Sequence, residues 1–174
     1  MDAESLVKLL GPSRVVRYER GPGYLLLVPP ASGVEVRAYR ERFTRLSTEL
    51  AWVFVASTGT AVSCRAAALG RARGFFRRTW SWEVEGEDAE ELRVLLSKVS
   101  GEEPIAGLLR KAKPEYVSVK AGEGELLVKV VKAVVGPYAG PLREAYDLSW
   151  KLAQLLAEGL SSSEGKMNEK WKNK

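Results

Sequence analysis

The chain contains no histidine and only one cysteine, Cys64, among its 174 residues. Without histidine, neither a Ser–His–Asp triad nor a Cys–His pair can form. Zinc sites built on histidine or on several cysteines are excluded for the same reason. A single cysteine also excludes an intrachain disulfide, which is typical of a reducing compartment. A metal would need oxygen ligands, and the carboxylates of this chain are more typical of a solvated surface. We predict no catalytic residue, no metal and no cofactor, and we interpret Cys64 as a small buried side chain.

Amide side chains are equally scarce. Gln154 is the only glutamine, and the two asparagines are Asn168 and Asn173, close to the C-terminal end. Few thermolabile amides, together with many Arg, Lys and Glu residues, are typical of heat-adapted proteins. We interpret the source as a thermophile, and compositional drift in a GC-rich genome is the alternative explanation.

Uninterrupted apolar runs of membrane length are also missing. The best candidate, residues 50–69, is uncharged only up to Cys64, because Arg65 follows, and it contains serine, threonine and glycine. A membrane-spanning helix needs about 20 apolar residues, and arginine inside it is costly. We expect a pair of buried strands there and no membrane span. The N-terminal residues lack the basic start and apolar core of a signal peptide, which predicts a cytoplasmic location.

Positive charge is abundant and unevenly distributed. The net charge is +5, yet residues 14–80 contain twelve arginines and only four acids, so the rest of the chain is net negative. Residues 65–82 hold five arginines and four aromatic side chains without an acid. Guanidinium groups suit phosphate oxygens, and aromatic faces stack on bases. A second group of arginines lies between residues 37 and 45, and it approaches the first if the strands form one meander.

The residues predicted to bind nucleic acid are therefore Arg37, Arg40, Arg42, Arg45, Arg65, Arg71, Arg73, Phe75, Phe76, Arg77 and Arg78. Two adjacent phenylalanines cannot both point inward from a regular strand, so we expect one of them to be exposed. An alternative is that the arginines pair with acids of the second half. Trp80 and Trp82 share a strand face with Val84, which is more typical of a core than of a stacking surface.

Hydrophobic periodicity predicts mostly strands in the first half of the chain. A short helix over 3–10 precedes strands over 14–20, 24–28 and 34–39. Residues 46–54 fit both helical and strand spacing, and their β-branched and aromatic content favours a strand. A turn at 58–60 then predicts a further strand around 61–65, and residues 77–85 alternate as the last strand of this half.

The second half begins with helical periodicity. Asp88 and Glu91 have the spacing of a capping box before the apolar positions 92, 95, 96 and 99. A second helix over 104–111, a hairpin over 116–120 and 125–135, and a closing helix from Pro141 to Gly159 follow. This order predicts an α+β fold: an antiparallel strand meander, two helices, a β-hairpin and a long C-terminal helix packed on the sheet. We expect one domain over 1–160 and a disordered basic tail over 161–174, which lacks an apolar period.

Other candidate sites have weaker patterns. Glu83 and Glu85 share one strand face, where two carboxylates could hold a metal or act as a pair of acids. The same pattern is typical of a solvated strand surface, which is the interpretation that we prefer. Lys129 and Lys132 lie in an apolar strand on opposite faces, and we expect each near a sheet edge with its amine in water. The glycine-containing segments 70–74 and 136–140 could hold an anion, but neither matches a phosphate-loop or dinucleotide fingerprint. We therefore interpret each of them as a hairpin or linker turn.

Together these patterns favour a nonenzymatic module that binds an anionic polymer, with nucleic acid as the preferred partner. The alternative is a structural or oligomerisation protein whose basic half docks on an acidic partner or on a second copy of the chain. An enzyme that works through lysine, tyrosine or carboxylate groups is a third interpretation.

Overall fold

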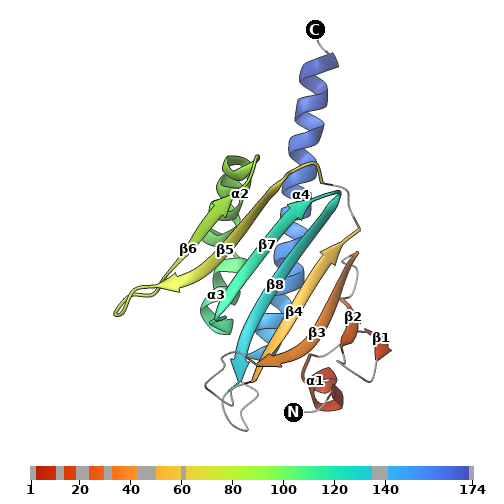
Figure 1. Cartoon of the computed structure of the whole chain (residues 1–174), viewed down its shortest axis with the longest axis vertical. Helices are drawn as coiled ribbons and strands as arrows, with labels where there is room; N and C mark the ends of the chain where they lie inside the picture. Colours follow the sequence, from red (N-terminus) through yellow and green to blue (C-terminus); the bar gives the residue numbers. More distant parts are fainter. Residues whose placement is uncertain are drawn as a thin grey trace.

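The computed structural model describes residues 3–10, 14–18, 24–29, 33–42, 50–59, 62–134 and 141–172. These residues form four helices and one eight-stranded antiparallel sheet (Figure 1). The helices are α1 (Ala3–Leu10), α2 (Ala89–Gly101), α3 (Ile105–Ala112) and α4 (Leu142–Lys172). The strands are β1 (Arg14–Tyr18), β2 (Leu25–Val28), β3 (Val34–Arg42), β4 (Leu50–Thr58), β5 (Ala66–Arg73), β6 (Thr79–Glu85), β7 (Tyr116–Gly122) and β8 (Glu125–Val134). The predicted α+β fold is confirmed, with the C-terminal helix packed on the sheet.

The strand order is β1-β2-β3-β4-β8-β7-β5-β6. Strands β1 to β4 form the expected meander, but β4 and β5 are not neighbours, because the β7–β8 hairpin lies between them. The apolar sequence of β8 suits this interior position, because Leu126, Val128 and Val130 are buried in the main core and Val131 is buried in a second, smaller cluster. A single meander through both arginine groups is therefore wrong.

One face of the sheet is covered by helices, and Figure 1 shows α2, α3 and α4 behind it. Val34, Val36 and Ala38 point to this face and are buried, whereas the intervening Glu35 and Arg37 are exposed on the other face. The main core lies between sheet and helices, as the alternation in β3 predicts. We call the opposite face, which no described helix covers, the open face.

The strand expected at 61–65 is wrong, because β5 begins at Ala66. The backbone of Arg65 bonds instead to the start of α2: its N–H donates to the Asp88 carboxylate at 2.8 Å, and its carbonyl accepts from the Asp88 N–H at 3.0 Å. The Asp88 carboxylate makes no capping hydrogen bond to its own helix, so the predicted capping box is wrong as well. The helix nevertheless begins where its periodicity indicates.

The last helix is longer than its apolar face predicts. It continues to Lys172, through most of the segment for which we expected disorder. Glu, Lys and Met in this segment have good helix propensity, which extends a helix that packing has already formed. No helix in the described part of the chain has both the length and the apolar composition to cross a bilayer. Residues 21–23, between the first two predicted strands, and the segment 136–140 lie outside the described residues.

Candidate nucleic-acid interface

The β5–β6 hairpin carries most of the first arginine group. It extends beyond the neighbouring strands, and its tip is the outermost part of that end of the sheet (Figure 1). Arg71 and Arg73 lie in β5 and point to the open face, while Arg77 and Arg78 belong to the turn; all four are exposed. The segment from Arg71 to Arg78 contains no acid. The structure therefore concentrates four positive charges at one projecting turn.

Two phenylalanines form the end of this turn. Phe75 is 92% exposed and Phe76 is 94% exposed, so both rings lie in solvent rather than the one that we predicted. Their centroids are 5.1 Å apart and their planes meet at 80°, an edge-to-face contact. Gly74 makes the turn with φ of +105°, and a Cβ at this position would lie 2.3 Å from the carbonyl oxygen of Arg77. A glycine is required here for both reasons.

The hairpin arginines are mostly without acidic partners. Arg73 forms an ion pair with Glu83 on the adjacent strand. Among the described residues, no carboxylate lies within 4.0 Å of the guanidinium groups of Arg71, Arg77 or Arg78. The interpretation that acids of the second half neutralise this group therefore does not hold for these three side chains. Arg65 is also exposed, but it lies at the far end of β5, before the strand begins.

The second arginine group lies elsewhere. Three strands, β4, β8 and β7, separate β3 from β5, which is a distance of about 19 Å at the usual strand spacing. Within β3, Arg37 points to the open face and its guanidinium lies 5.2 Å from the ring centroid of Tyr24. Arg40 points to the opposite face, 5.5 Å from the ring of Trp52, and Arg42 shares that face. The expected convergence of the two groups is wrong, and Arg45 lies outside the described residues.

The tryptophans of β6 pack toward the core, which is the alternative that we gave for them. Trp80 and Trp82 lie on the helix-covered face, and the Trp82 indole N–H donates to the hydroxyl of Ser100 in α2 at 2.8 Å. Both rings cross over Gly70, where a Cβ would lie 2.7 Å from each ring. Residues 70–73 are part of β5 and Gly74 begins the turn to β6, so segment 70–74 belongs to a hairpin, as we interpreted it, and is not an anion loop.

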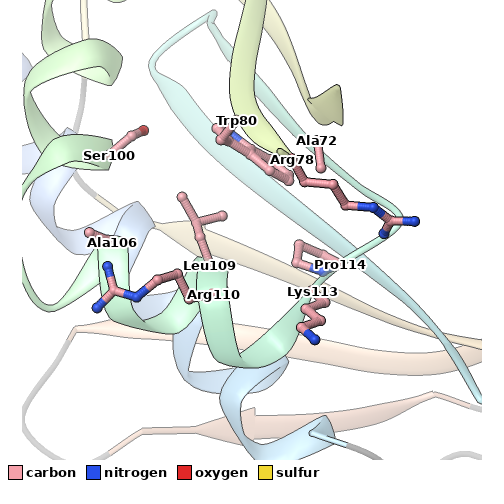
Figure 2. A pocket seen from close by; sticks show the side chains of 9 residues that line it. All are labelled: Ala72, Arg78, Trp80, Ser100, Ala106, Leu109, Arg110, Lys113 and Pro114. Atoms are coloured by element: carbon pink, nitrogen blue, oxygen red, sulfur yellow. The ribbon is translucent and has the colours of Figure 1, made fainter. Parts of the chain in front are cut away.

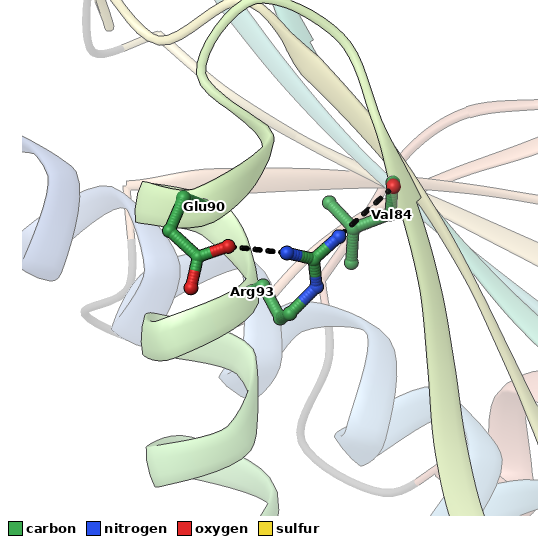
Figure 3. Close-up of polar contacts among 3 residues, drawn as sticks. All are labelled: Val84, Glu90 and Arg93. Atoms are coloured by element: carbon green, nitrogen blue, oxygen red, sulfur yellow. Dashed lines mark hydrogen bonds and ion pairs between the residues drawn. The ribbon is translucent and has the colours of Figure 1, made fainter.

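The base of the hairpin is fixed to α2 by a charged side chain. Figure 3 shows Arg93 reaching from α2 to the edge strand β6, where its guanidinium donates to the carbonyl of Val84 at 3.4 Å. The same guanidinium pairs with Glu90 one turn earlier in the helix. This contact occupies a backbone acceptor on an edge strand, where unpaired groups otherwise invite strand addition.

A groove opens between the hairpin and α3 on the helix-covered side. Its volume is about 610 Å³. Figure 2 shows Trp80 and Leu109 in the middle of the groove lining. Arg110 lies on one side of them, and Arg78 and Lys113 lie on the other side. The remaining lining residues are Ala72, Ser100, Ala106 and Pro114. Sequence reasoning missed Arg110 and Lys113, because only the tertiary fold brings α3 beside the hairpin.

The two strand lysines differ from our expectation. Both lie in β8, an interior strand between β4 and β7, so the predicted edge position is wrong, although they do point to opposite faces. Lys129 lies 3.9 Å from the Glu41 carboxylate and 5.7 Å from the ring centroid of Tyr116. Burial lowers the pKa of Lys129, but Tyr116, Glu41 and Tyr39 more than offset it, so that the pKa is raised overall. This lysine is charged and paired, which does not suit a nucleophile.

Comparison with known proteins gives no relative. No family model matches the chain, and neither a curated protein nor a solved structure matches it.

Proposed function

We propose that this protein is a nonenzymatic binding module for single-stranded nucleic acid, and that the β5–β6 hairpin is its interface. The observation that carries the proposal is the pair of exposed phenylalanines, Phe75 and Phe76, between exposed arginines. Exposed aromatic side chains of this kind provide stacking surfaces for unpaired bases, and arginines neutralise the phosphates beside them. The interface is smaller than the sequence indicates, because the arginines of β3 do not belong to it.

Single strands suit this hairpin better than a duplex. A base can stack on an aromatic ring only where it is unpaired, and a stacked base contributes about 1–3 kcal/mol. We expect these arginines to contact phosphates, and phosphate contacts carry no sequence information. The protein should therefore bind many nucleotide sequences with similar affinity. We also expect four phosphate contacts, from Arg71, Arg73, Arg77 and Arg78, which are the charges nearest the two rings.

The test is fluorescence anisotropy with labelled 20-nucleotide RNA and DNA strands at several salt concentrations. Four phosphate contacts on a single strand predict a slope of about −3 in a plot of log affinity against log salt. Arg77→Ala should reduce the magnitude of that slope by about 0.7. The double variant Phe75→Ala, Phe76→Ala should weaken binding at least about five-fold at every salt concentration and leave the slope unchanged.

Arg42→Ala is the matched control, because it removes the same charge at the other end of the sheet. It should leave the affinity unchanged at 150 mM salt. Vesicles of phosphatidylserine and phosphatidylcholine are tested in parallel, since basic turns with aromatic tips also suit anionic lipid surfaces. Binding to vesicles without binding to either nucleic acid would replace our proposal with a membrane-surface function.

The alternative, docking of the basic half on an acidic partner or a second copy, is tested by light scattering. A stable dimer that dissociates in the Phe75→Ala, Phe76→Ala variant, together with no nucleic-acid binding, would favour that alternative. A monomer at low and moderate salt would remove self-association from consideration.

A further inference from the structure

We infer that the groove between the hairpin and α3 is a second binding site, which shares only Arg78 with the hairpin interface, for a small flat molecule that carries an anionic group, such as a nucleoside monophosphate. This inference goes beyond the proposed function, because it needs neither a polymer nor the exposed phenylalanines. The groove volume of about 610 Å³ falls within the range of about 300–1,000 Å³ that is usual for small-molecule sites.

The positive charge of the groove lining indicates an anionic ligand. Three of the nine described residues that line the groove are cationic, namely Arg78, Arg110 and Lys113, and none of the nine is acidic. Arg110 is partly neutralised by Glu103 at 2.9 Å, a carboxylate that does not line the groove. Arg78 and Lys113 have no carboxylate within 4.0 Å among the described residues. An anion placed between these two would supply the missing counter-charge.

The backbone supports the position of Lys113. This residue ends α3 with φ of +45° and ψ of +56°, a left-handed conformation that costs energy for a side chain other than glycine. Its N–H donates to the carbonyl of Leu109 at 3.1 Å, and its own carbonyl accepts from the amine of Lys132 at 2.9 Å. The second bond offsets the negative end of the helix, which would otherwise repel an anion. A charged residue therefore stands where a glycine would be less strained, and such positions are frequent in ligand sites.

The other walls of the groove are suited to a flat ring. Trp80, Leu109, Ala72, Ala106 and Pro114 provide apolar surface. Ser100 also lines the groove, and because its hydroxyl oxygen accepts from Trp82, its hydroxyl hydrogen can donate to a ligand. This combination of apolar walls with a few polar groups is typical of sites that orient a small ligand.

The experiment titrates the full chain with adenosine monophosphate, adenosine and inorganic phosphate, using calorimetry and the indole N–H signals in an NMR spectrum. We expect adenosine monophosphate to bind and to shift the Trp80 signal, which Trp80→Phe identifies. Adenosine and phosphate should each bind at least ten-fold more weakly. Lys113→Ala should weaken the binding of adenosine monophosphate at least ten-fold. Lys111→Ala removes the same charge from an exposed position outside the groove and should leave this affinity unchanged.

Two comparisons separate this inference from the proposed function. Phe75→Ala, Phe76→Ala should weaken the binding of 20-nucleotide strands that lack a 5′-phosphate and leave the binding of adenosine monophosphate unaffected. Lys113→Ala should weaken the binding of adenosine monophosphate and leave the binding of those strands unaffected. The source of the ligand is tested with strands that carry or lack a 5′-phosphate: a preference abolished by Lys113→Ala identifies a strand end in the groove, and no preference identifies a free molecule. No binding of adenosine monophosphate at millimolar concentration, or binding that Lys113→Ala leaves unchanged, would overturn the inference.

Discussion

Among single residues, Cys64 shows most directly what burial does to chemistry. Its side chain is 3% exposed, and burial together with the nearby carboxylates of Glu91 and Asp88 raises the pKa of the thiol to about 11. A thiol is reactive only as the thiolate. In the folded protein at pH 8, only about one thiol in a thousand is ionised, far fewer than in the unfolded chain.

We predict that Cys64 resists alkylation in the native protein at pH 8 and reacts rapidly in denaturant, as followed by mass spectrometry with iodoacetamide. The folded chain keeps this proton between about pH 8.5 and pH 11, whereas the unfolded chain releases it. The contribution of the thiol to stability is therefore complete below that window and lost as the pH rises through it. Native labelling within ten-fold of the denatured rate at pH 8 would contradict the assignment of Cys64 as buried.

Gly70 is a second residue whose role is set by its neighbours. A Cβ there would lie 2.7 Å from the rings of both Trp80 and Trp82, in a region without space for it. We predict that Gly70→Ala lowers the free energy of unfolding by about 1–3 kcal/mol, because overpacking forces the rings to move. Urea denaturation followed by tryptophan fluorescence measures this loss.

The matched control for this change is Gly122→Ala in β7. A Cβ at Gly122 meets no atom within 4 Å, so this substitution should not lower the stability by more than about 0.5 kcal/mol. Equal losses in the two variants would show that the tryptophans are not held as described.

At the scale of elements, the end of α3 combines strain with charge. The left-handed conformation of Lys113 costs about 1–2 kcal/mol for an ordinary residue and is available to glycine. We predict that Lys113→Gly raises the free energy of unfolding by about 0.5–1 kcal/mol, because the relief of strain exceeds the extra entropy of the unfolded chain. Urea denaturation checks the sign.

Lys111→Gly provides the opposite expectation. Lys111 has helical conformation in the last turn of α3, so glycine there should lower the stability by up to about 1 kcal/mol. If both glycine variants lost stability, the left-handed conformation of Lys113 would not be the strained feature that we describe.

Helices and strands that depend on residues close together in the chain could be predicted from the sequence. The arrangement of these elements in the sheet could not be predicted. Helix α3 and the β7–β8 hairpin follow from apolar spacing and turn residues that lie close together in the chain. The insertion of that hairpin between β4 and β5 depends on contacts between distant residues, and no local pattern encodes it. The candidate site divides in the same way. The exposure of one phenylalanine follows from adjacency, whereas the groove exists only once Arg78 and Lys113 are folded together.

At the scale of the whole molecule, the strand order distributes the positive charge into two separate regions. The β5–β6 hairpin and β3 lie toward opposite ends of the sheet (Figure 1). The intervening strands place them about 19 Å apart, roughly twice the Debye length of about 8 Å at physiological salt. The excess of arginine in the first half of the sequence therefore does not act as one field under those conditions.

This separation predicts how a charge reversal in β3 depends on salt. At 150 mM salt, Arg42→Glu should leave the affinity for a 20-nucleotide strand within two-fold of the unmodified protein, while Arg77→Glu should reduce it at least ten-fold. At 10 mM salt, where the Debye length is about 30 Å, the Arg42→Glu effect should become measurable, because the screening no longer separates the two regions. Anisotropy titrations at both salt concentrations give the comparison. Equal losses from the two variants at 150 mM salt would mean that the strand crosses the sheet and contacts β3, so that the hairpin alone is not the interface.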